Sequence, residues 1–453
     1  MDKELEELSC SAVEISHIAR RLGLDFYPVQ FEICPAEALY TFGAYGMPVR
    51  FTHWSFGKAF YRLKTQYDLN LSRIYELVIN SNPAYAFLLE GNRLIQNKLV
   101  MAHVYAHVDF FKNNRYFNRT PKDMVERMGA HAERVREHEL RFGRDKVEQT
   151  LDALLAIQEH VDSRAHIAPT NRTQEVTSKQ KRHQVRPYDD LFEFGVVWDD
   201  EQEQPVTKEH DDLLLFLIEN APGLAEWQRD LASIVRTESL YFYPQMETKI
   251  INEGWATFWH ERILRELDLS VGESVDFAVM HSQVVQPARW QLNPYYLGFK
   301  MWESIGQRYG DEGLFEIREA NNDISFVRNY LNQDLVEQLN LFNYRKVGAH
   351  WQVSDTNWEK VRDNLVQGLV NCGHPRILVV DGDYEGKGAL YLRHAHEGVD
   401  LDVLYMEKTL ALVQFLWGKS VFLETRLDDK QVLYECSNGT VTRRQPSGNT
   451  KKN

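Results

Sequence analysis

Cysteine is scarce in this chain. Four cysteines occur among 453 residues, namely Cys10, Cys34, Cys372 and Cys436, and no two of them form a CxxC pair. This pattern argues against a disulfide framework and against a zinc site built from cysteines. It is typical of a protein from a reducing compartment, so we expect a cytoplasmic location.

Long apolar runs and an excess of basic residues are also missing. No stretch of about 18 apolar residues is present, so we expect no membrane insertion. The N-terminal segment, MDKELEELSCSAVEISHIARRLG, is acidic and amphipathic, unlike a signal peptide. The net charge of −14 argues against binding to nucleic acid. Residues 382–388, GDYEGKG, are rich in glycine but lack the Lys-Ser/Thr pair of a P-loop, which argues against a nucleotide site there.

The residues that are present predict an ordered α+β protein. Hydrophobic residues make up 43% of the chain, and its length allows two or three domains. We expect a large, mainly helical domain over residues 1–343, interrupted by a polar excursion at 163–212. Runs of β-forming residues predict a small α+β domain over 344–436, and the polar residues 437–453 predict a disordered tail.

Periodicity places the individual elements. Helices are predicted at 3–23, 50–68, 92–113, 121–162 (one helix or two), 211–240, 247–268, 273–286, 294–309, 313–343 (with Asn321-Asn322 and Asn332-Gln333 as candidate breaks) and 406–417. Strands are predicted at 74–80, 376–380, 388–393, 420–424 and 431–434.

The segment LVMAHVYAHVDFFKNN, residues 99–114, holds two histidines four positions apart. On a helix, His103 and His107 therefore lie on one face, one turn apart, where both can bind a single metal ion. The spacing is that of the HExxH helix of zinc peptidases, but Val104 stands where that motif has its glutamate base. The alternative is a pair of ordinary helix histidines that only make hydrogen bonds.

A second segment, ETKIINEGWATFWH at 247–260, offers a carboxylate. Glu253 lies within an apolar, aromatic stretch, where a carboxylate is costly to bury unless it is bound to a metal or paired with Arg or Lys. His260 follows seven positions later, on the same helix face, and is predicted either as a fourth ligand or as a partner of a ligand. His107 and Glu253 are 146 positions apart (253 − 107), so a large insertion must loop out between them.

These two segments resemble the helices of gluzincin peptidases. Asn252 to Ala256, NEGWA, is similar to the N-E-G-F-A string around the third ligand of that group, and VMAHVYAH is similar to V-x-A-H-E-x-x-H of aminopeptidases. The resemblance implies a Zn²⁺ ion bound by His103, His107 and Glu253. A base other than residue 104 would be needed, and Glu90, Asp109 and Glu247 are the candidates.

Other polar groups are weaker candidates. Glu148, Asp152 and His160 share a helix face, as in a di-iron bundle, but the paired Glu-x-x-His signature is missing, so we expect core-edge or surface roles. The remaining pocket or metal candidates are His53, Trp54, His281, residues 293–296, His394 and His396.

The chain as a whole resembles the SpoVR family. The strings that carry this likeness are YTFGAYGMPVRFTHWSFGKAFYRLKTQYDLNLSRIYELVINSNPAYAFLLEGN (40–92), AHVYAHVDFFKNN, INEGWATFWH and NPYYLGFKMWESI, within a match over about residues 5–435. The resemblance implies a cytoplasmic bacterial protein tied to spore cortex formation, with relatives in bacteria that make no spores. The family has no firmly assigned reaction.

Two functions are consistent with these observations. The first is a zinc-dependent, peptidase-like hydrolase that acts on a peptide or on a cell-wall-related substrate. The second is a non-catalytic regulator that keeps a peptidase-like shell and binds a peptide or a protein partner. Val104 favours the second function, whereas the possible ligand set favours the first. Elemental analysis would separate a metal-binding chain from a chain without metal.

Overall fold

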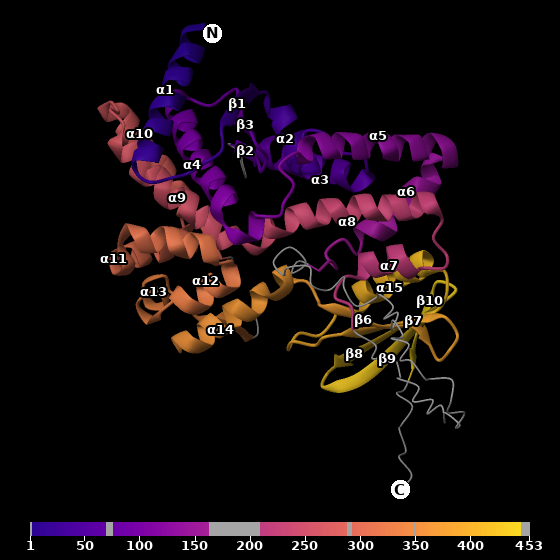
Figure 1. Ribbon diagram of the computed structural model, residues 1–453. Helices are drawn as coiled ribbons and strands as arrows, with labels where there is room; N and C mark the ends of the chain where they lie inside the picture. Colours follow the sequence, from indigo (N-terminus) through magenta and orange to yellow (C-terminus); the bar gives the residue numbers. More distant parts are fainter. Residues whose placement is uncertain (1, 69–75, 163–208, 288–291, 348–349, 445–453) are drawn as a thin grey trace, which may run out of the picture.

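The computed structural model of this protein describes residues 2–68, 76–162, 209–287, 292–347 and 350–444. Helices dominate the N-terminal part, and a small sheet with one covering helix forms the C-terminal part (Figure 1). The predicted α+β class is therefore confirmed, as are the large helical region and the small sheet-containing region.

Thirteen α-helices among the described residues form the N-terminal part as far as residue 338. They are α1 (Asp2–Arg21), α2 (Ala36–Tyr45), α3 (Trp54–Asp68), α4 (Leu94–Asn113), α5 (Met124–Phe142), α6 (Arg144–Leu155), α7 (Leu213–Asn220), α8 (Glu226–Glu247), α9 (Lys249–Glu266), α10 (Val271–Val284), α11 (Pro294–Ala320, with a kink at Gly310), α12 (Asp323–Tyr330) and α13 (Gln333–Gln338).

A three-stranded sheet lies beside these helices. Its strands are β1 (Val29–Cys34), β2 (Glu76–Ile79) and β3 (Ala84–Leu89), in the order β1-β3-β2. β1 runs parallel to β3, with Val29 opposite Ala84, and β2 runs antiparallel to β3. β3 leads through a short connection into α4, so this sheet fixes where the histidine-bearing helix begins.

The centre of the helical part is the contact between α4, α9 and α11. α4 is apolar on most of its circumference, and every residue from Val100 to Phe111 is buried. α9 contributes the buried Trp255 and Trp259, which pack against each other, and Trp255 also packs against Trp302 of α11. A helix that is buried all round belongs to a core, and its few polar side chains must find partners inside that core.

Two glycines let α9 and α11 approach closely. A Cβ atom added to Gly254 would lie 2.3 Å from the carbonyl carbon of Gly298, and one added to Gly298 would lie 2.2 Å from the Ile250 oxygen. Neither position can therefore hold a side chain unless the helices move apart. Because Gly254 directly follows Glu253, this contact fixes the depth at which that carboxylate sits.

The C-terminal part begins with a hairpin. β4 (Asn343–Val347) pairs with β5 (His350–Asp355), and α14 (Trp358–Leu369) follows. Val361 and Val366 of α14 lie in the same apolar core as α4 and α9. The five-stranded sheet has the order β10-β9-β8-β7-β6 and is covered by α15 (Val403–Trp417). Its strands are β6 (Ile377–Tyr384), β7 (Ala389–His394), β8 (Val421–Leu427), β9 (Lys430–Ser437) and β10 (Thr440–Arg444).

Two predictions need correction. The helix predicted over 247–268 is broken at Thr248, where α8 ends and α9 begins, so Glu247 and Glu253 lie on different helices. The tail predicted to be disordered from residue 437 forms β10 over Thr440–Arg444, because these residues pair antiparallel with β9. Residues 445–453, and most of the excursion at 163–212, lie outside the described residues. The domain boundary near residue 343 stays a prediction.

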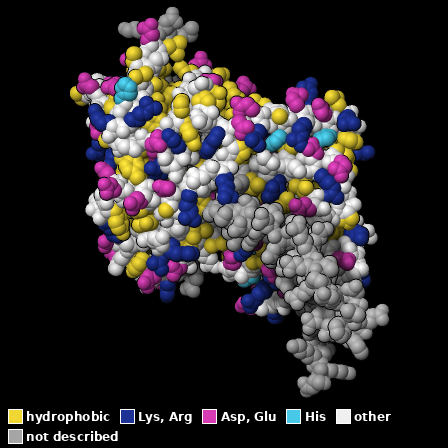
Figure 2. Space-filling view, viewed as in Figure 1, with side chains coloured by type: hydrophobic (Ala, Val, Ile, Leu, Met, Phe, Trp, Pro, Cys, Tyr) yellow, Lys and Arg dark blue, Asp and Glu magenta, His cyan; other side chains and the backbone are white. Residues whose placement is uncertain are grey.

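The surface carries both signs of charge. On the face shown in Figure 2, acidic and basic side chains are interspersed with apolar ones. Among the helices that the structure describes, none has both the length and the apolar character needed to cross a bilayer.

Candidate metal centre

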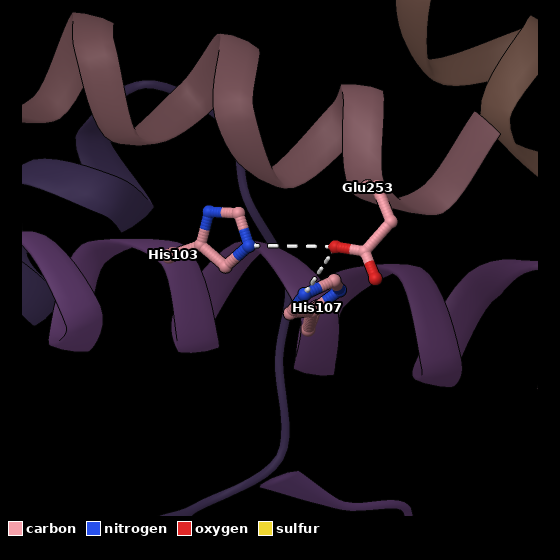
Figure 3. A group of neighbouring side chains, drawn as sticks. All are labelled: His103, His107 and Glu253. Atoms are coloured by element: carbon pink, nitrogen blue, oxygen red, sulfur yellow. Dashed lines mark ion pairs between the residues drawn. The ribbon is translucent and has the colours of Figure 1, made fainter. Parts of the chain in front are cut away.

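Two helices that are remote in sequence cross to form the site. α4 presents His103 and His107 one turn apart, and α9 places Glu253 across them (Figure 3). The Oε2 atom of Glu253 lies 3.7 Å from Nε2 of His103 and 3.5 Å from Nε2 of His107. One ligand atom from each of the three residues lies within 4.8 Å of the others. The large sequence insertion between the motifs is thus compatible with one shared site.

The spacing of these atoms fits a small tetrahedral cation. Ligands about 2.0–2.1 Å from a zinc ion are held roughly 3.3–3.4 Å apart along the tetrahedron edge. The two distances from Glu253 are close to this value and longer than an ordinary hydrogen bond. Within the described residues, the buried Oε2 atom of Glu253 has no hydrogen-bond partner. A carboxylate oxygen and two imidazole nitrogens are ligands that Zn²⁺ accepts.

Each histidine is oriented through its other ring nitrogen. Nδ1 of His107 lies 2.9 Å from Oδ1 of Asn252, the residue before Glu253. Nδ1 of His103 lies 2.9 Å from Nδ1 of His260. Histidines that bind a metal usually donate their second N–H to such a partner, which fixes the tautomer and the ring direction. Here both Nε2 atoms are turned toward Glu253.

The electrostatics of the site favour a charged carboxylate at Glu253 and a neutral ring at His260. Burial alone would raise the pKa of Glu253, but its interactions with His103 and His107 outweigh burial and hold this pKa well below the ordinary value. Burial, followed by the neighbouring histidines, lowers the pKa of His260 well below that of a free histidine. A neutral ring can both donate and accept a hydrogen bond, as His260 must do between two other rings.

The site opens into a cavity of about 970 Å³. Its wall combines apolar and polar side chains from α2, α4, α8, α9, α10 and α11, and the ring of Tyr295 stacks on His103 with centroids 6.1 Å apart. Two cations line this cavity. Arg50 is paired with the buried Glu238 at 2.7 Å, whereas Lys249, one turn before Glu253 on α9, is exposed. A substrate or peptide segment could therefore reach the site.

The three predicted bases lie outside this cavity wall. Glu90 is exposed at the end of β3. Asp109 faces away, where it accepts hydrogen bonds from the Asp25 backbone and the Trp255 indole and pairs with Arg318 at 3.3 Å. Burial raises the pKa of Asp109 to about 6, although Arg318 opposes this. Val104, the residue at the position of the missing glutamate, is fully buried in the core.

Glu247 lines a different cavity of about 300 Å³, together with Tyr243 and Cys372. Its Oε2 atom accepts a hydrogen bond of 3.2 Å from Asn322. Burial raises the pKa of Glu247 to about 7, and the nearby Asp323 adds to that increase.

The structure also locates the weaker candidates. His53 lies 3.2 Å from Asp152, which accepts a hydrogen bond from Trp54. Glu148 lies 3.9 Å from Arg144. His160 is held at the edge of the second cavity, where burial lowers its pKa to about 4. His394 bonds to Thr425 and His396 to Asp400. Within the described residues, none of these belongs to a second group of metal-ligand geometry.

Two features of the site were not singled out from the sequence. The sequence indicates Asn252 only as the first residue of the NEGWA string, whereas in the structure it orients His107. Glu238 is fully buried and bonds to Arg50 and His131 behind the cavity wall. A glutamate directly before the largely apolar run SLYFYP was the available signal, but its partners Arg50 and His131 come from distant segments.

Comparison with known proteins gives two family matches. The family described as "SpoVR like protein" matches residues 2–374, and the family described as "SpoVR-like C-terminal domain" matches residues 375–428. A relative from Escherichia coli (strain K12), named "Uncharacterized protein YcgB", is 31% identical over 488 aligned positions, which cover 95% of this chain and 94% of the relative. No solved structure matches.

Proposed function

Because this chain belongs to the SpoVR family, whose name links it to sporulation, we propose that it is a metal-binding, peptidase-like protein of spore cortex formation. The proposed ligands of a Zn²⁺ ion are His103, His107 and Glu253. The proposed substrate is a peptide or a cell-wall-related compound that carries an amide bond.

One observation carries this proposal. Two histidine Nε2 atoms and one carboxylate oxygen converge, while each histidine uses its Nδ1 atom for a buried hydrogen bond. Hydrogen bonding alone would not require both rings to aim their second nitrogen at one carboxylate oxygen that lies beyond hydrogen-bond distance. When bound, a zinc ion polarises a carbonyl group and makes water a nucleophile near neutral pH.

The residues of the chain have distinct proposed tasks. Asn252 and His260 orient the two ligand rings, and the Gly254–Gly298 contact holds Glu253 at its depth. Tyr295, stacked on His103, shields one side of the site. The exposed Lys249 gives the cavity a positive charge one turn from Glu253, which favours a substrate with a carboxylate nearby.

A hydrolase also needs a general base that accepts a proton from the attacking water. None of Glu90, Asp109 and Glu247 lines the cavity, and besides Glu253 the only carboxylate among its described wall residues is Glu159. A positioned base contributes about 10²–10⁴-fold to such a reaction. With valine at position 104 and all three predicted bases outside the cavity wall, turnover of peptides should be slow. This favours the second candidate, a regulator that binds a peptide or protein partner without turnover.

The test starts with purified protein stripped of metal and reloaded with Zn²⁺ or Co²⁺. We expect one ion per chain, a tetrahedral Co²⁺ spectrum, and loss of both in His107→Ala. His396→Ala serves as the matched control, because His396 lies in the C-terminal part and bonds to Asp400. The zinc-loaded protein is then assayed on a mixed peptide library. Cleavage that disappears in His107→Ala supports the hydrolase, whereas metal binding without cleavage supports the regulator.

A further inference from the structure

Three histidines are hydrogen-bonded in series behind the site. Nδ1 of His103 lies 2.9 Å from Nδ1 of His260, and Nε2 of His260 lies 3.0 Å from Nδ1 of His281. The series begins at a buried ligand on α4, passes through the fully buried ring on α9, and ends at a partly buried ring on α10. Phe277 and Phe299 pack against the ring of His281.

Such a series has two possible directions when each ring is neutral and carries one proton. In the first, His103 donates from Nδ1 to His260, and His260 donates from Nε2 to His281. In the second, His281 donates from Nδ1 to His260, and His260 donates from Nδ1 to His103. Each ring keeps one proton in both, so the directions differ only in tautomer.

Only the first direction leaves the lone pair of His103 Nε2 available for a metal ion. In the second direction His103 Nε2 carries the proton and points it toward the Glu253 carboxylate. A metal at the site therefore requires His281 to accept through Nδ1, whereas the metal-free site allows His281 to donate. The state of the site thus changes the hydrogen-bonding role of a side chain on α10.

α10 is a weakly anchored helix. None of its residues is fully buried. His281 joins it to α9, and Phe277 and Met280 pack, partly buried, against the main apolar core. Two ion pairs join it to α4 and its N-cap, Lys98 with Glu273 at 2.8 Å and Arg93 with Asp276 at 2.7 Å. Its end forms part of the cavity wall through Met280, Gln283 and Val284. Elements with little buried surface open at low free energy, so a single hydrogen bond can change how firmly α10 closes the cavity.

We propose that His281 is a positioning residue that couples metal occupancy to the closure of α10 over the cavity. The proposal rests on the proposed metal site. With a metal on His103, the series is held in its first direction and α10 is fixed against α9. By linkage, the factor by which docked α10 raises metal affinity equals the factor by which the metal stabilises the docked helix.

The test compares His281→Leu, which removes the hydrogen bond, with His281→Gln, which can still accept one. Outer partners of metal ligands typically contribute roughly 10–100-fold to metal affinity. We expect zinc affinity to fall by a factor in that range in His281→Leu and to recover largely in His281→Gln. Asp276→Asn is the matched control, because it loosens α10 at a surface ion pair without touching the histidine series, and it should leave zinc affinity within about threefold.

Hydrogen exchange gives a readout independent of activity. In the unmodified protein, zinc should slow amide exchange in residues 271–284 by a factor similar to the affinity loss in His281→Leu. In His281→Leu, zinc should no longer slow it. Unchanged zinc affinity in a folded His281→Leu protein, or zinc-independent exchange of α10 in the unmodified protein, overturns the coupling while the metal site stands. Absence of zinc binding in the unmodified protein overturns the proposed function itself.

Discussion

Two glutamates only six positions apart, Glu247 and Glu253, occupy opposite electrostatic environments. Glu253 faces two histidine rings, and their interactions keep its pKa well below the ordinary value despite burial. Glu247 ends the preceding helix and lies near a second buried acid, Asp323, so burial raises its pKa to about 7. The first environment favours the ionised carboxylate of Glu253, which can bind a cation. The second favours the protonated, neutral acid of Glu247.

Asp323 shows why the second environment is structural. Its two oxygens accept hydrogen bonds from the backbone of Ile250 and Ile251, at 2.9 and 2.8 Å, so it satisfies the free N–H groups at the start of α9. Burial nevertheless raises the pKa of Asp323 to about 7. This pair holds the α8–α9 junction, whereas Glu253, one turn further along α9, is left to face the cavity.

The difference between the two environments is tested most strongly by neutralising each glutamate in turn. We predict that Glu253→Gln lowers zinc affinity by at least about 100-fold, because a ligand is worth more than an outer partner. Glu247→Gln should leave zinc affinity within about threefold, since Glu247 lines another cavity. Competition titration with a chromophoric chelator measures both. Equal losses in the two variants would contradict the distinction between the environments.

Substitution of Gly254 should weaken zinc binding almost as much, because the close contact of Gly254 with Gly298 determines how far Glu253 lies from α4 and α11. We predict that Gly254→Ala destabilises the protein by roughly 1–3 kcal/mol, since a methyl group there overlaps Gly298, and that zinc binding weakens with it. Chemical denaturation and zinc titration of the same samples provide the measurement.

Gly57→Ala is the matched control for this glycine. Gly57 lies in α3, and an added Cβ meets nothing within 4 Å. This variant should be neutral or more stable by up to about 1 kcal/mol, since alanine favours a helix. A Gly254→Ala protein as stable as Gly57→Ala would show that the helices can separate at little cost.

Glu247→Gln should have a smaller effect that depends on pH. The folded-state pKa of Glu247 is raised, so the protonated acid is favoured in the native state and stability falls as the pH rises from about 4.5 through about 7. Glutamine does not ionise and can still accept the Asn322 hydrogen bond. We therefore predict that the variant matches the unmodified protein near pH 4.5 and is more stable by roughly 3 kcal/mol at pH 8.

Thermal unfolding across pH 4.5–8.5 measures this difference. A constant gap between the two proteins, or a gap that closes as the pH rises, would contradict the raised pKa of Glu247 and the environment inferred for it.

Some of these helices and strands could be predicted from the sequence, and others could not. The helix at 92–113 was predictable because its apolar run is continuous, and β6 to β9 of the C-terminal sheet were predictable from their local patterns. β10 was not, because its run TVTRR is mostly polar. β1 and β3 were not, because they pair across more than fifty residues and the run AYAFLL is equally compatible with a helix. Non-local pairing leaves little trace in a single sequence.

The site shows the same limit. The spacing of His103 and His107 and the NEGWA string identified the converging side chains, since both are local patterns. The break at Thr248 places Glu247 on α8 and Glu253 on α9. It could not be predicted, because the helical periodicity of the sequence continues through this position. The hydrogen bonds from His103 to His260 and from His107 to Asn252 depend on how α4 and α9 cross, which no local pattern specifies.

The central claim is that His103, His107 and Glu253 hold a metal ion, and metal content tests it most directly. The full-length protein, purified without chelators or affinity metals, should contain about one zinc ion per chain by elemental analysis. The folded triple variant His103→Ala, His107→Ala, Glu253→Gln should contain none. An unmodified protein that holds no more metal than this variant, and that takes up none when titrated with Zn²⁺, Co²⁺, Fe²⁺ or Mn²⁺, would contradict the account.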